Sequence, residues 1–307
     1  MSAGRTPHVC LIDGSGLAHR ANAMARPRQA ASGAEIGAVW LFSQMLGKLL
    51  RRMALAPKRL DGIGIFFDPD RDSLWRRKLH AGYKAHRPDT APDFTAQVAW
   101  MVQLCADLGM HVARIEGLEA DDLIASETRA ALAEGARVSI LSQDKDLMQL
   151  IEGRVWQMDP MRNLWFDAAA VRERIGVPPA RIADFLALCG DAGDGVPGVR
   201  GVGPATAKAM VAAHGDLESI LAVAPTLDGV GARRIASAAD AARLSYRLVA
   251  LDADHAPPMP APEGIDGLRW PAAFEASRID PMIDGWRQTA LLGPQPGQGA
   301  ALFGPSG

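Results

Sequence analysis

Three short apolar segments of this chain each run into an aspartate. They are rich in Val, Ile, Leu and Phe, and stretches with helical periodicity separate them. Short apolar strands that alternate with helices predict an α/β fold, with a mostly parallel sheet covered by helices on both faces. In such sheets the ligand crevice lies at the carboxyl ends of the strands. The pattern therefore predicts that three carboxylates meet at one edge of the sheet: Asp13, Asp68 and Asp144.

Two acidic clusters lie between and after these segments, and Asp146 stands beside Asp144. A single aspartate after a strand is most simply a turn residue or a helix cap, and acidic residues that open a helix complement its dipole. At roughly 4 Å and an effective dielectric near 20, however, each like-charged pair repels by about 4 kcal/mol, so a cluster of this size needs cations. The candidate metal ligands are Asp13, Asp68, Glu119, Asp121, Asp122, Asp144, Asp146, Asp191 and Asp194.

The residue types favour one class of metal and one kind of compartment. Oxygen donors suit hard divalent cations such as Mg²⁺, whereas Cys and His, which zinc prefers, are few near these carboxylates. The three cysteines lie in apolar segments without paired spacing, which predicts free thiols in a reducing environment. No apolar run approaches the roughly 18 residues of a membrane span, and the N-terminus lacks a signal-peptide pattern. The sequence therefore predicts a soluble, cytoplasmic protein.

A basic segment between residues 71 and 87 stands out against the net charge of −2. It carries six Lys and Arg residues against a single acidic residue, and Trp, His and Tyr side chains lie between them. Cations mixed with aromatic rings are typical of single-strand nucleic-acid binding, through phosphate attraction and base stacking. Composition alone fits a solvated loop equally well. Beside a metal cluster suited to phosphodiester cleavage, nucleic-acid binding is the favoured interpretation.

A glycine-rich turn at residues 197–203 opens onto a helix expected at 205–214. The turn lacks the GxxxxGK[ST] order and no clear strand precedes it, so neither a Walker loop nor a dinucleotide fingerprint fits. A helix–hairpin–helix accounts for it better, because glycines let the backbone approach a phosphate and the opening N–H groups of the helix bind an anion. Such a motif contacts the nucleic-acid backbone and not the bases. Its candidate contacts are Gly198, Gly201, Val202, Gly203 and Lys208.

Hydrophobic periodicity also predicts where the elements lie. From about residue 168 onward the pattern is helical, and residues 253–307 are rich in Pro, Gly and Ala, which predicts a partly disordered or loosely docked tail. Strands are expected at 8–13, 62–67, 111–113 and 137–142, with weaker signals at 154–158 and 164–166. Earlier helices are expected at 36–53, 92–107 and 120–134.

Several short motifs occur here in one known arrangement. They are Ile12-Asp13-Gly14, Phe67-Asp68, residues 82–87, Glu119-Ala120-Asp121-Asp122, Asp144-Lys145-Asp146-Leu147, Gly190-Asp191 with Asp194, and the Gly198–Gly203 turn. Together they closely resemble the 5′-nuclease (flap endonuclease) family, in particular the 5′–3′ exonuclease domain of bacterial DNA polymerase I, over roughly residues 8–250. The resemblance implies a PIN-like core at 1–180 with a helical arch at 70–91, a helix–hairpin–helix DNA-binding module at 181–252, and a tail at 253–307.

The resemblance also implies roles for the candidate residues. It places one metal among Asp13, Asp68, Glu119, Asp121 and Asp122. It places the second towards Asp144, Asp146, Asp191 and Asp194. The implied ions are two Mg²⁺, for which Mn²⁺ can substitute, and K⁺ at the hairpin.

The basic segment corresponds by resemblance to the arch, which a 5′ single strand passes. Lys84 would contact the scissile phosphate there, and Arg87 would be the second catalytic cation. Besides the hairpin residues, the candidate DNA contacts are Arg20, Arg76, Arg77 and Tyr83.

The activity that this resemblance implies is structure-specific 5′–3′ exonuclease and flap endonuclease cleavage of DNA, in replication (primer removal) and repair. The length of 307 residues leaves no room for a polymerase domain, which predicts a stand-alone, monomeric, nucleoid-associated bacterial enzyme with a DNA polymerase as partner. Two other classes stay open. One is a DNA-structure-binding protein whose nuclease activity has lapsed, and the other is an RNA-cleaving PIN-type enzyme. Action on RNA–DNA hybrids is open as well.

Overall fold

The centre of the molecule is a six-stranded sheet. The computed structural model describes residues 6–54 and 60–251, so the predicted tail at 253–307 lies outside the described residues. The strand order is β3-β2-β1-β4-β5-β6, and every neighbouring pair is parallel except β5 and β6. The strands are β1 (His8–Asp13), β2 (Gly62–Phe66), β3 (His111–Ala113), β4 (Arg137–Leu141), β5 (Val155–Asp159) and β6 (Leu164–Phe166).

The strand order reverses at β1, which pairs with β2 on one side and with β4 on the other. Sequence periodicity predicted all six strands to within one residue at each end, because fully apolar runs mark strands that are buried on both faces. The point at which the order reverses is where open parallel sheets bind their ligands, beyond the carboxyl ends of the strands. The predicted mostly parallel sheet is therefore confirmed. Its topology places the expected ligand site at the carboxyl ends of β1, β2 and β4.

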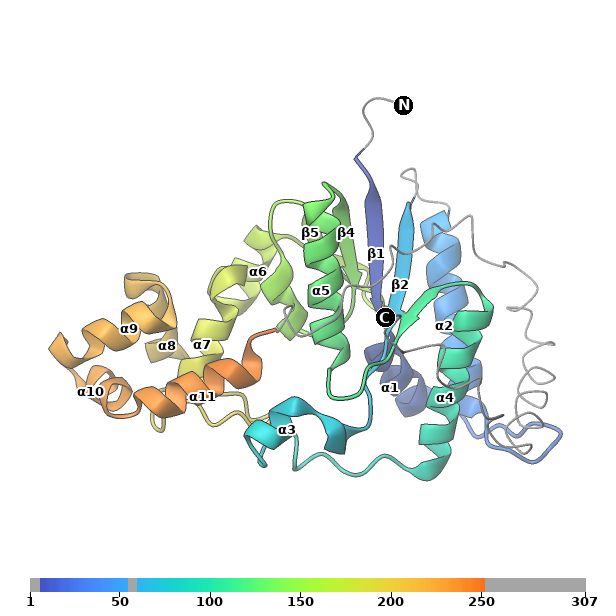
Figure 1. Cartoon of the computed structure of the whole chain (residues 1–307), viewed down its shortest axis with the longest axis horizontal. Helices are drawn as coiled ribbons and strands as arrows, with labels where there is room; N and C mark the ends of the chain where they lie inside the picture. The colour runs from blue at the N-terminus through green and yellow to red at the C-terminus, as the bar shows by residue number, and fades with distance from the viewer. Residues whose placement is uncertain (1–5, 55–59, 252–307) are drawn as a thin grey trace, which may run out of the picture.

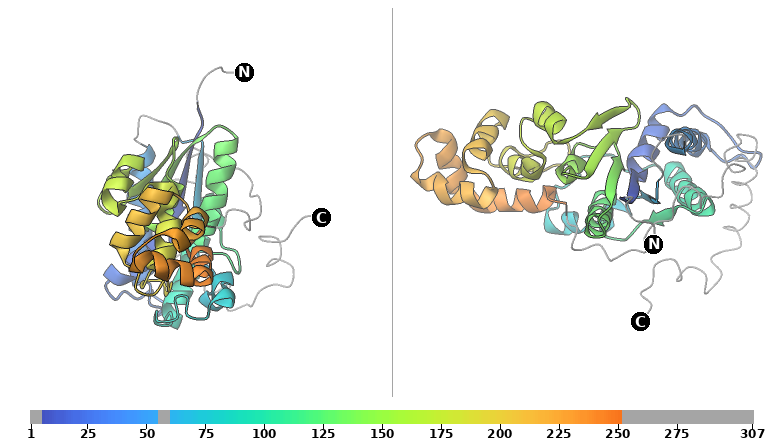
Figure 2. Two further views of the ribbon diagram at one scale, coloured as in Figure 1. Left: turned by 90° about the vertical axis from the view of Figure 1, so that its left-hand side faces the viewer. Right: turned by 90° about the horizontal axis from the view of Figure 1, so that it is seen from above.

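Helices cover both faces of the sheet (Figures 1 and 2). Alternate residues of β1 point to opposite sides, so Cys10 and Ile12 join one hydrophobic cluster and Val9 and Leu11 another. The first cluster contains α1 (Gly14–Met24), α2 (Gly37–Ala54) and α4 (Pro92–Asp107). The second is closed by α5 (Ala120–Ala133), whose apolar side faces β1 and β4.

A helical region follows the sheet and extends the molecule along its longest axis (Figure 1). It has its own hydrophobic cluster, in which α11 packs against α7. The predicted change to a helical pattern after residue 168 is confirmed. The helices are α6 (Ala168–Ile175), α7 (Ile182–Cys189), α8 (Pro204–His214), α9 (Leu217–Val223), α10 (Val230–Ser237) and α11 (Ala239–Val249).

The basic segment 71–87 contacts both parts of the molecule. It contains a 3-10 turn, η1 (Arg71–Ser73), and the short helix α3 (Trp75–Leu79). Leu74 and Tyr83 belong to the hydrophobic cluster of the helical region, so these two positions of the expected arch are packed against protein. Three further 3-10 turns are η2 (Asp146–Leu150), η3 (Pro179–Arg181) and η4 (Ala224–Thr226). Among the helices of the described residues, none combines the length and apolarity that a membrane crossing requires.

Candidate active site

The three strand-end aspartates lie at the same edge of the sheet, as predicted, and each accepts a hydrogen bond from a nearby backbone N–H. Asp13 accepts from Gly16 N–H at 2.7 Å and so caps α1. Asp68 accepts from Ala120 N–H at 2.8 Å, at the start of α5. Asp144 accepts from the N–H of Asp146 at 2.8 Å. These aspartates can therefore accept backbone hydrogen bonds and still serve as candidate metal ligands, because a cap fixes a carboxylate without cancelling its charge.

Several buried carboxylates at this edge have raised pKa values. Burial raises the pKa of Asp13 to about 7, and the charges of Asp68 and Asp144 add to the rise. Burial, followed by repulsion from Asp144 and Asp13, also raises the pKa of Asp121 well above its ordinary value. Loss of contact with bulk water and repulsion from Asp144 raise the pKa of Asp146 to about 7. Such mutual shifts identify acidic groups that lie close together and lack enough positive charge.

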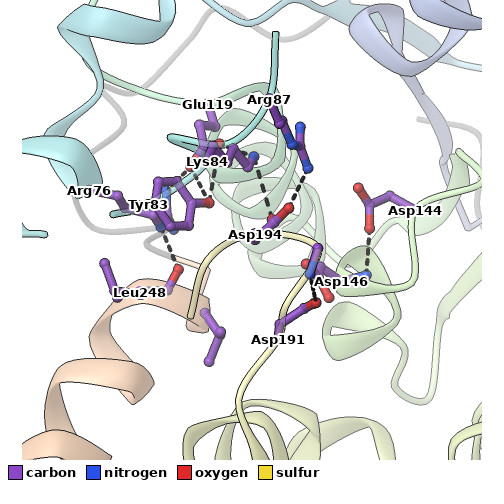
Figure 3. Close-up of polar contacts among 12 residues, drawn as sticks. Arg76, Tyr83, Lys84, Arg87, Glu119, Asp144, Asp146, Asp191, Asp194 and Leu248 are labelled. Carbon is purple, nitrogen blue, oxygen red and sulfur yellow. Dashed lines mark hydrogen bonds and ion pairs between the residues drawn. The ribbon is translucent and has the colours of Figure 1, made fainter. Parts of the chain in front are cut away.

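The carboxylate oxygens at this edge are suitable ligands for a divalent cation. None of the described residues donates a hydrogen bond to Asp146 Oδ1, which is buried, and an unpaired buried oxygen of this kind is what a metal ligand requires. Within the described residues, no three acidic, His or Cys side chains are already gathered around one point. Lysine and arginine side chains engage part of the set instead. Asp191 accepts from Lys145 at 2.6 Å, and Asp194 pairs with Arg87 (Figure 3).

Asp122 does not belong to this group, which corrects its assignment as a metal ligand. Its side chain is 0% exposed, and its two oxygens bind the guanidinium of Arg76 at 2.6 and 2.7 Å. It also accepts the backbone N–H of Glu119 in a capping box that opens α5. The buried cation offsets the charge of Asp122, so this carboxylate does not need a metal ion to compensate it.

Arg76 and Tyr83 are not available to DNA either, which corrects two predicted contacts. Arg76 is 2% exposed and has ion pairs with both Glu119 and Asp122. Tyr83 is 4% exposed and donates its O–H to Glu119 at 3.0 Å. Both side chains instead hold Glu119, whose pKa is lowered by the charges of Lys84 and Arg76 despite its burial. Base stacking on Tyr83 is therefore excluded in this conformation.

Lys84 lies between the two groups of carboxylates (Figure 3). Its ammonium pairs with Glu119 and lies 3.6 Å from Asp194, and its backbone N–H donates to the carbonyl of Asp194 at 2.9 Å. Its φ of +51° is in the left-handed region, which is uncommon for a residue with a side chain. The loop that carries Asp194 thus holds Lys84 in an unusual backbone conformation beside the acidic cluster.

A cavity of about 540 Å³ opens beside Lys84 and Asp68. Arg87 and Arg71 of the basic segment line it together with His19, and so do two side chains that sequence reasoning did not assign to the site, Phe94 and Arg114. The ring of His19 packs against Phe94 with centroids 5.3 Å apart. Arg114 follows β3 directly, so the strand-end rule that found the aspartates would also have found this cation. Cationic and aromatic side chains give the cavity the chemistry of a nucleotide-strand site.

The glycine-rich turn departs from its predicted use at two positions. Gly198 is buried, and a Cβ there would lie 2.3 Å from the backbone nitrogen of Gly190, so its glycine permits close packing of two backbones. Val202 is buried and its N–H donates to the carbonyl of Val199 at 2.9 Å. Neither residue is positioned to contact a phosphate, and both assignments are corrected.

The remaining candidate DNA contacts keep at least partial access to solvent. Gly201 and Gly203 are exposed, and Gly203 caps the start of α8. Lys208, on α8, places its ammonium 5.6 Å from the ring centroid of Phe185. Arg20 is exposed on α1 beside Asp13, and the partly exposed Arg77 lies 3.6 Å from Asp72.

We expect the metal-free protein to lose stability as pH rises from about 4 to about 7 and to level off above. Asp13 and Asp146 have pKa values of about 7 in the fold against an ordinary 3.8, so the native state binds more protons than the unfolded chain across this window. The buried Glu127, whose pKa rises to about 7, contributes in the same direction. Urea unfolding between pH 4.5 and 8.5 in EDTA measures the slope, and Asp146→Asn should reduce it. Adding Mg²⁺ at pH 8 should restore stability, and a slope of opposite sign would contradict the shifts.

The sequence matches known proteins over nearly all of its described length. Residues 8–176 match the "5′-3′ exonuclease, N-terminal resolvase-like domain" family and residues 177–270 the "5′-3′ exonuclease, C-terminal SAM fold" family. The chain is 37% identical to DNA polymerase I of Rhizobium leguminosarum over 80% of this chain, but it spans only 25% of that protein. It is 32% identical to the flap endonuclease Xni of Aeromonas hydrophila, with 88% of this chain and 98% of the relative covered.

A solved structure shares the fold. The T5 5′-exonuclease with bound divalent metal ions (zinc) superposes with a TM-score of 0.67, at 19% identity, over 80% of this chain and 90% of that one. Three findings point to the same family: the two domain matches, the relative that is covered along almost its whole length, and the carboxylates at one edge of the sheet. The chain belongs to the 5′–3′ exonuclease family of metal-dependent nucleases, which includes flap endonucleases.

Proposed function

We propose that this protein is a structure-specific 5′–3′ exonuclease and flap endonuclease that hydrolyses DNA phosphodiesters with two Mg²⁺ ions, in primer removal and repair. The observation that carries the proposal is the group of acidic side chains with raised pKa values at the point where the strand order reverses, beside a cavity whose lining includes Lys84, Arg87 and Arg114 as well as acids. Mn²⁺ is the expected substitute for Mg²⁺, because both ions favour oxygen ligands.

The carboxylates divide between two ion positions. When bound, the two ions supply a reactive water at neutral pH and stabilise charge on the attacking and leaving oxygens. The first position would use Asp13, Asp68 and Asp121, with Glu119 held nearby by Lys84, Arg76 and Tyr83. The second would use Asp144, Asp146, Asp191 and Asp194.

The cations beside the carboxylates orient the substrate. Lys84 and Arg87 line the cavity and already pair with acids, so each can exchange a carboxylate for a phosphate oxygen. The cavity would hold the 5′ strand, with Arg20 and Arg77 as further cations. Gly201, Gly203 and Lys208 would hold the duplex backbone at the start of α8, where N–H groups attract phosphate. The same proposal includes K⁺ at this hairpin and domain boundaries at residues 180 and 252. It also includes a monomeric state, association with nucleoid DNA and a polymerase partner.

A labelled 5′-flap duplex tests the proposal directly. We expect Mg²⁺-dependent release of the flap that EDTA abolishes, and slower degradation from a free 5′ end. Parallel reactions with an RNA–DNA hybrid and with single-stranded RNA separate the DNA enzyme from an RNA-cleaving one. Binding of the flap duplex without cleavage under Mg²⁺ or Mn²⁺ would instead identify a DNA-structure-binding protein and overturn the proposed activity.

A further inference from the structure

The guanidinium of Arg76 joins the start of α5 to the end of α11. It forms five hydrogen bonds, which equals its number of N–H donors. Three go to carboxylate oxygens of Glu119 and Asp122, which open α5, at 2.6 to 2.8 Å. Two go to the backbone carbonyls of Leu248 and Ala250, at 2.9 Å each. One buried side chain therefore fixes the distance between two helices that belong to different hydrophobic clusters (Figure 3).

A second side chain holds the same end of α11 from another direction. Gln149 donates its side-chain N–H to the carbonyl of Val249 at 2.9 Å. Gln149 belongs to η2, the 3-10 turn that begins with Asp146. The last carbonyls of a helix lack partners within the helix, so their bonds must come from elsewhere. Here two of the bonds come from Arg76, which also binds Glu119, and the third comes from η2, which carries Asp146.

The other contact that matters lies one turn earlier on α11. Ser245, which is fully buried, accepts the backbone N–H of Gly198 at 3.0 Å. Gly198 opens the glycine-rich turn that leads into α8. The side of α11 near its end also lines a small cavity with Asp121, Asp146 and Asp194. One helix is therefore hydrogen-bonded to the glycine-rich turn through Ser245, to η2 through Gln149, and to the start of α5 through Arg76.

We propose that α11 couples duplex binding at the hairpin to the positions of the catalytic carboxylates, with Ser245, Arg76 and Gln149 as positioning residues. The inference rests on the proposed function and adds a means of regulating it. A duplex bound at the hairpin would fix the position of α11, and α11 would in turn fix the positions of the start of α5 and of η2. Arginine suits this task because its planar, forked donors bind a carboxylate in two places and still reach carbonyls. None of the three residues touches the reacting atoms.

The test compares two substrates in single-turnover reactions with Mg²⁺: a 5′-flap duplex and a single strand of the same flap sequence, which cannot occupy the hairpin. We expect wild-type protein to cut the flap duplex faster, and Gln149→Ala and Ser245→Ala each to lower that rate about tenfold or more, as for other residues that position ligands. In these two variants the rate on the single strand should change less than about threefold, so the ratio of the two rates falls. Arg76→Lys should lower both rates, because Arg76 also holds Glu119. A purely structural role would lower both rates together and leave their ratio unchanged.

Two matched variants provide the controls. Arg154→Lys also weakens an arginine that binds backbone carbonyls, those of Gly135 and Leu132, but at an exposed site. Gln103→Ala removes an exposed glutamine that donates to Asp107. Both should keep the wild-type ratio. Unchanged ratios in both Gln149→Ala and Ser245→Ala would overturn the proposal.

A second measurement keeps the inference separate from the proposed activity. Hydrogen exchange is followed with a duplex in EDTA, where no cleavage occurs. Binding should slow exchange at residues 198–203 and also at 119–124 and 146–150. In Ser245→Ala and Gln149→Ala the slowing should persist at 198–203 and disappear from at least one of the two distant segments. Slowing confined to 198–203 in the wild type would refute the coupling even for an active nuclease. Propagated slowing in a protein that cuts nothing would support the coupling and refute the nuclease.

Discussion

Asp68→Ala is expected to abolish cleavage of a 5′-flap duplex, with a fall of at least about 10²-fold in the single-turnover rate. Removing a residue that only orients a metal ligand commonly costs 10- to 100-fold, so loss of a ligand itself should cost more. Affinity for the duplex should stay the same or increase, because the substitution removes a negative charge from the cavity that we propose holds the 5′ strand. Rapid-quench cleavage and fluorescence anisotropy in Ca²⁺ measure the two quantities.

Two comparisons show whether a loss of rate reflects the metal. Asp68→Ala also removes the acceptor for Ala120 N–H, which typically contributes about 1 kcal/mol at a helix start. Asp68→Asn keeps an acceptor oxygen and loses only the charge, so it should fold normally and still be inactive. Asp107→Ala changes a partly exposed acid at the end of α4, where the chain turns back towards the start of β3, and should leave the rate unchanged. Mg²⁺-dependent turnover by Asp68→Asn would remove Asp68 from the metal site.

The features that could be predicted from the sequence are those that depend on residues close together in the chain. Strands and their order along the chain follow from runs of apolar residues, and Asp13, Asp68 and Asp144 follow because parallel strands end at a common edge. Arg114 lies at the same edge and was missed only because the argument considered acids alone. The glycine at 198 was singled out for the wrong reason, since both a phosphate contact and close backbone packing require the absence of a side chain.

The errors at Arg76, Tyr83 and Asp122 share one physical cause, which is a contact between distant parts of the chain. Arg76 donates to the carbonyl of Leu248, 172 residues away, and to Glu119 and Asp122, and these contacts together remove it from solvent. Arginine is rarely buried unless it is paired, so sequence reasoning assigned Arg76 to the surface and hence to DNA. The same arginine binds Asp122, which removes that residue from the metal ligands. Tyr83 is buried where its O–H donates to Glu119. Local periodicity contains no information about such pairs.

Lys84 and Lys208 should show opposite defects, because one cation faces the carboxylate cluster and the other lies on the helical region. Lys84 pairs with Glu119 beside the cavity, so it can stabilise charge that develops on the phosphate during cleavage. A donor directed at such charge typically contributes about 10²–10³ in rate. Lys84→Ala should therefore slow saturated single-turnover cleavage by about that factor, while the dissociation constant for the duplex rises only a fewfold.

Lys208→Ala should leave the saturated rate nearly intact and weaken binding, and the weakening should depend on salt. Loss of one phosphate contact lowers the slope of log affinity against log salt by about one unit. The variant also loses the contact of the ammonium with the ring of Phe185, worth roughly 0.5–1 kcal/mol at an exposed site, so its unfolding must be measured alongside. Lys208→Arg retains both the charge and the ring contact and should restore affinity. Equal losses of rate in Lys84→Ala and Lys208→Ala would show that the two lysines do not divide catalysis and binding, because a phosphate anchor acts before the chemical step and a transition-state contact acts during it.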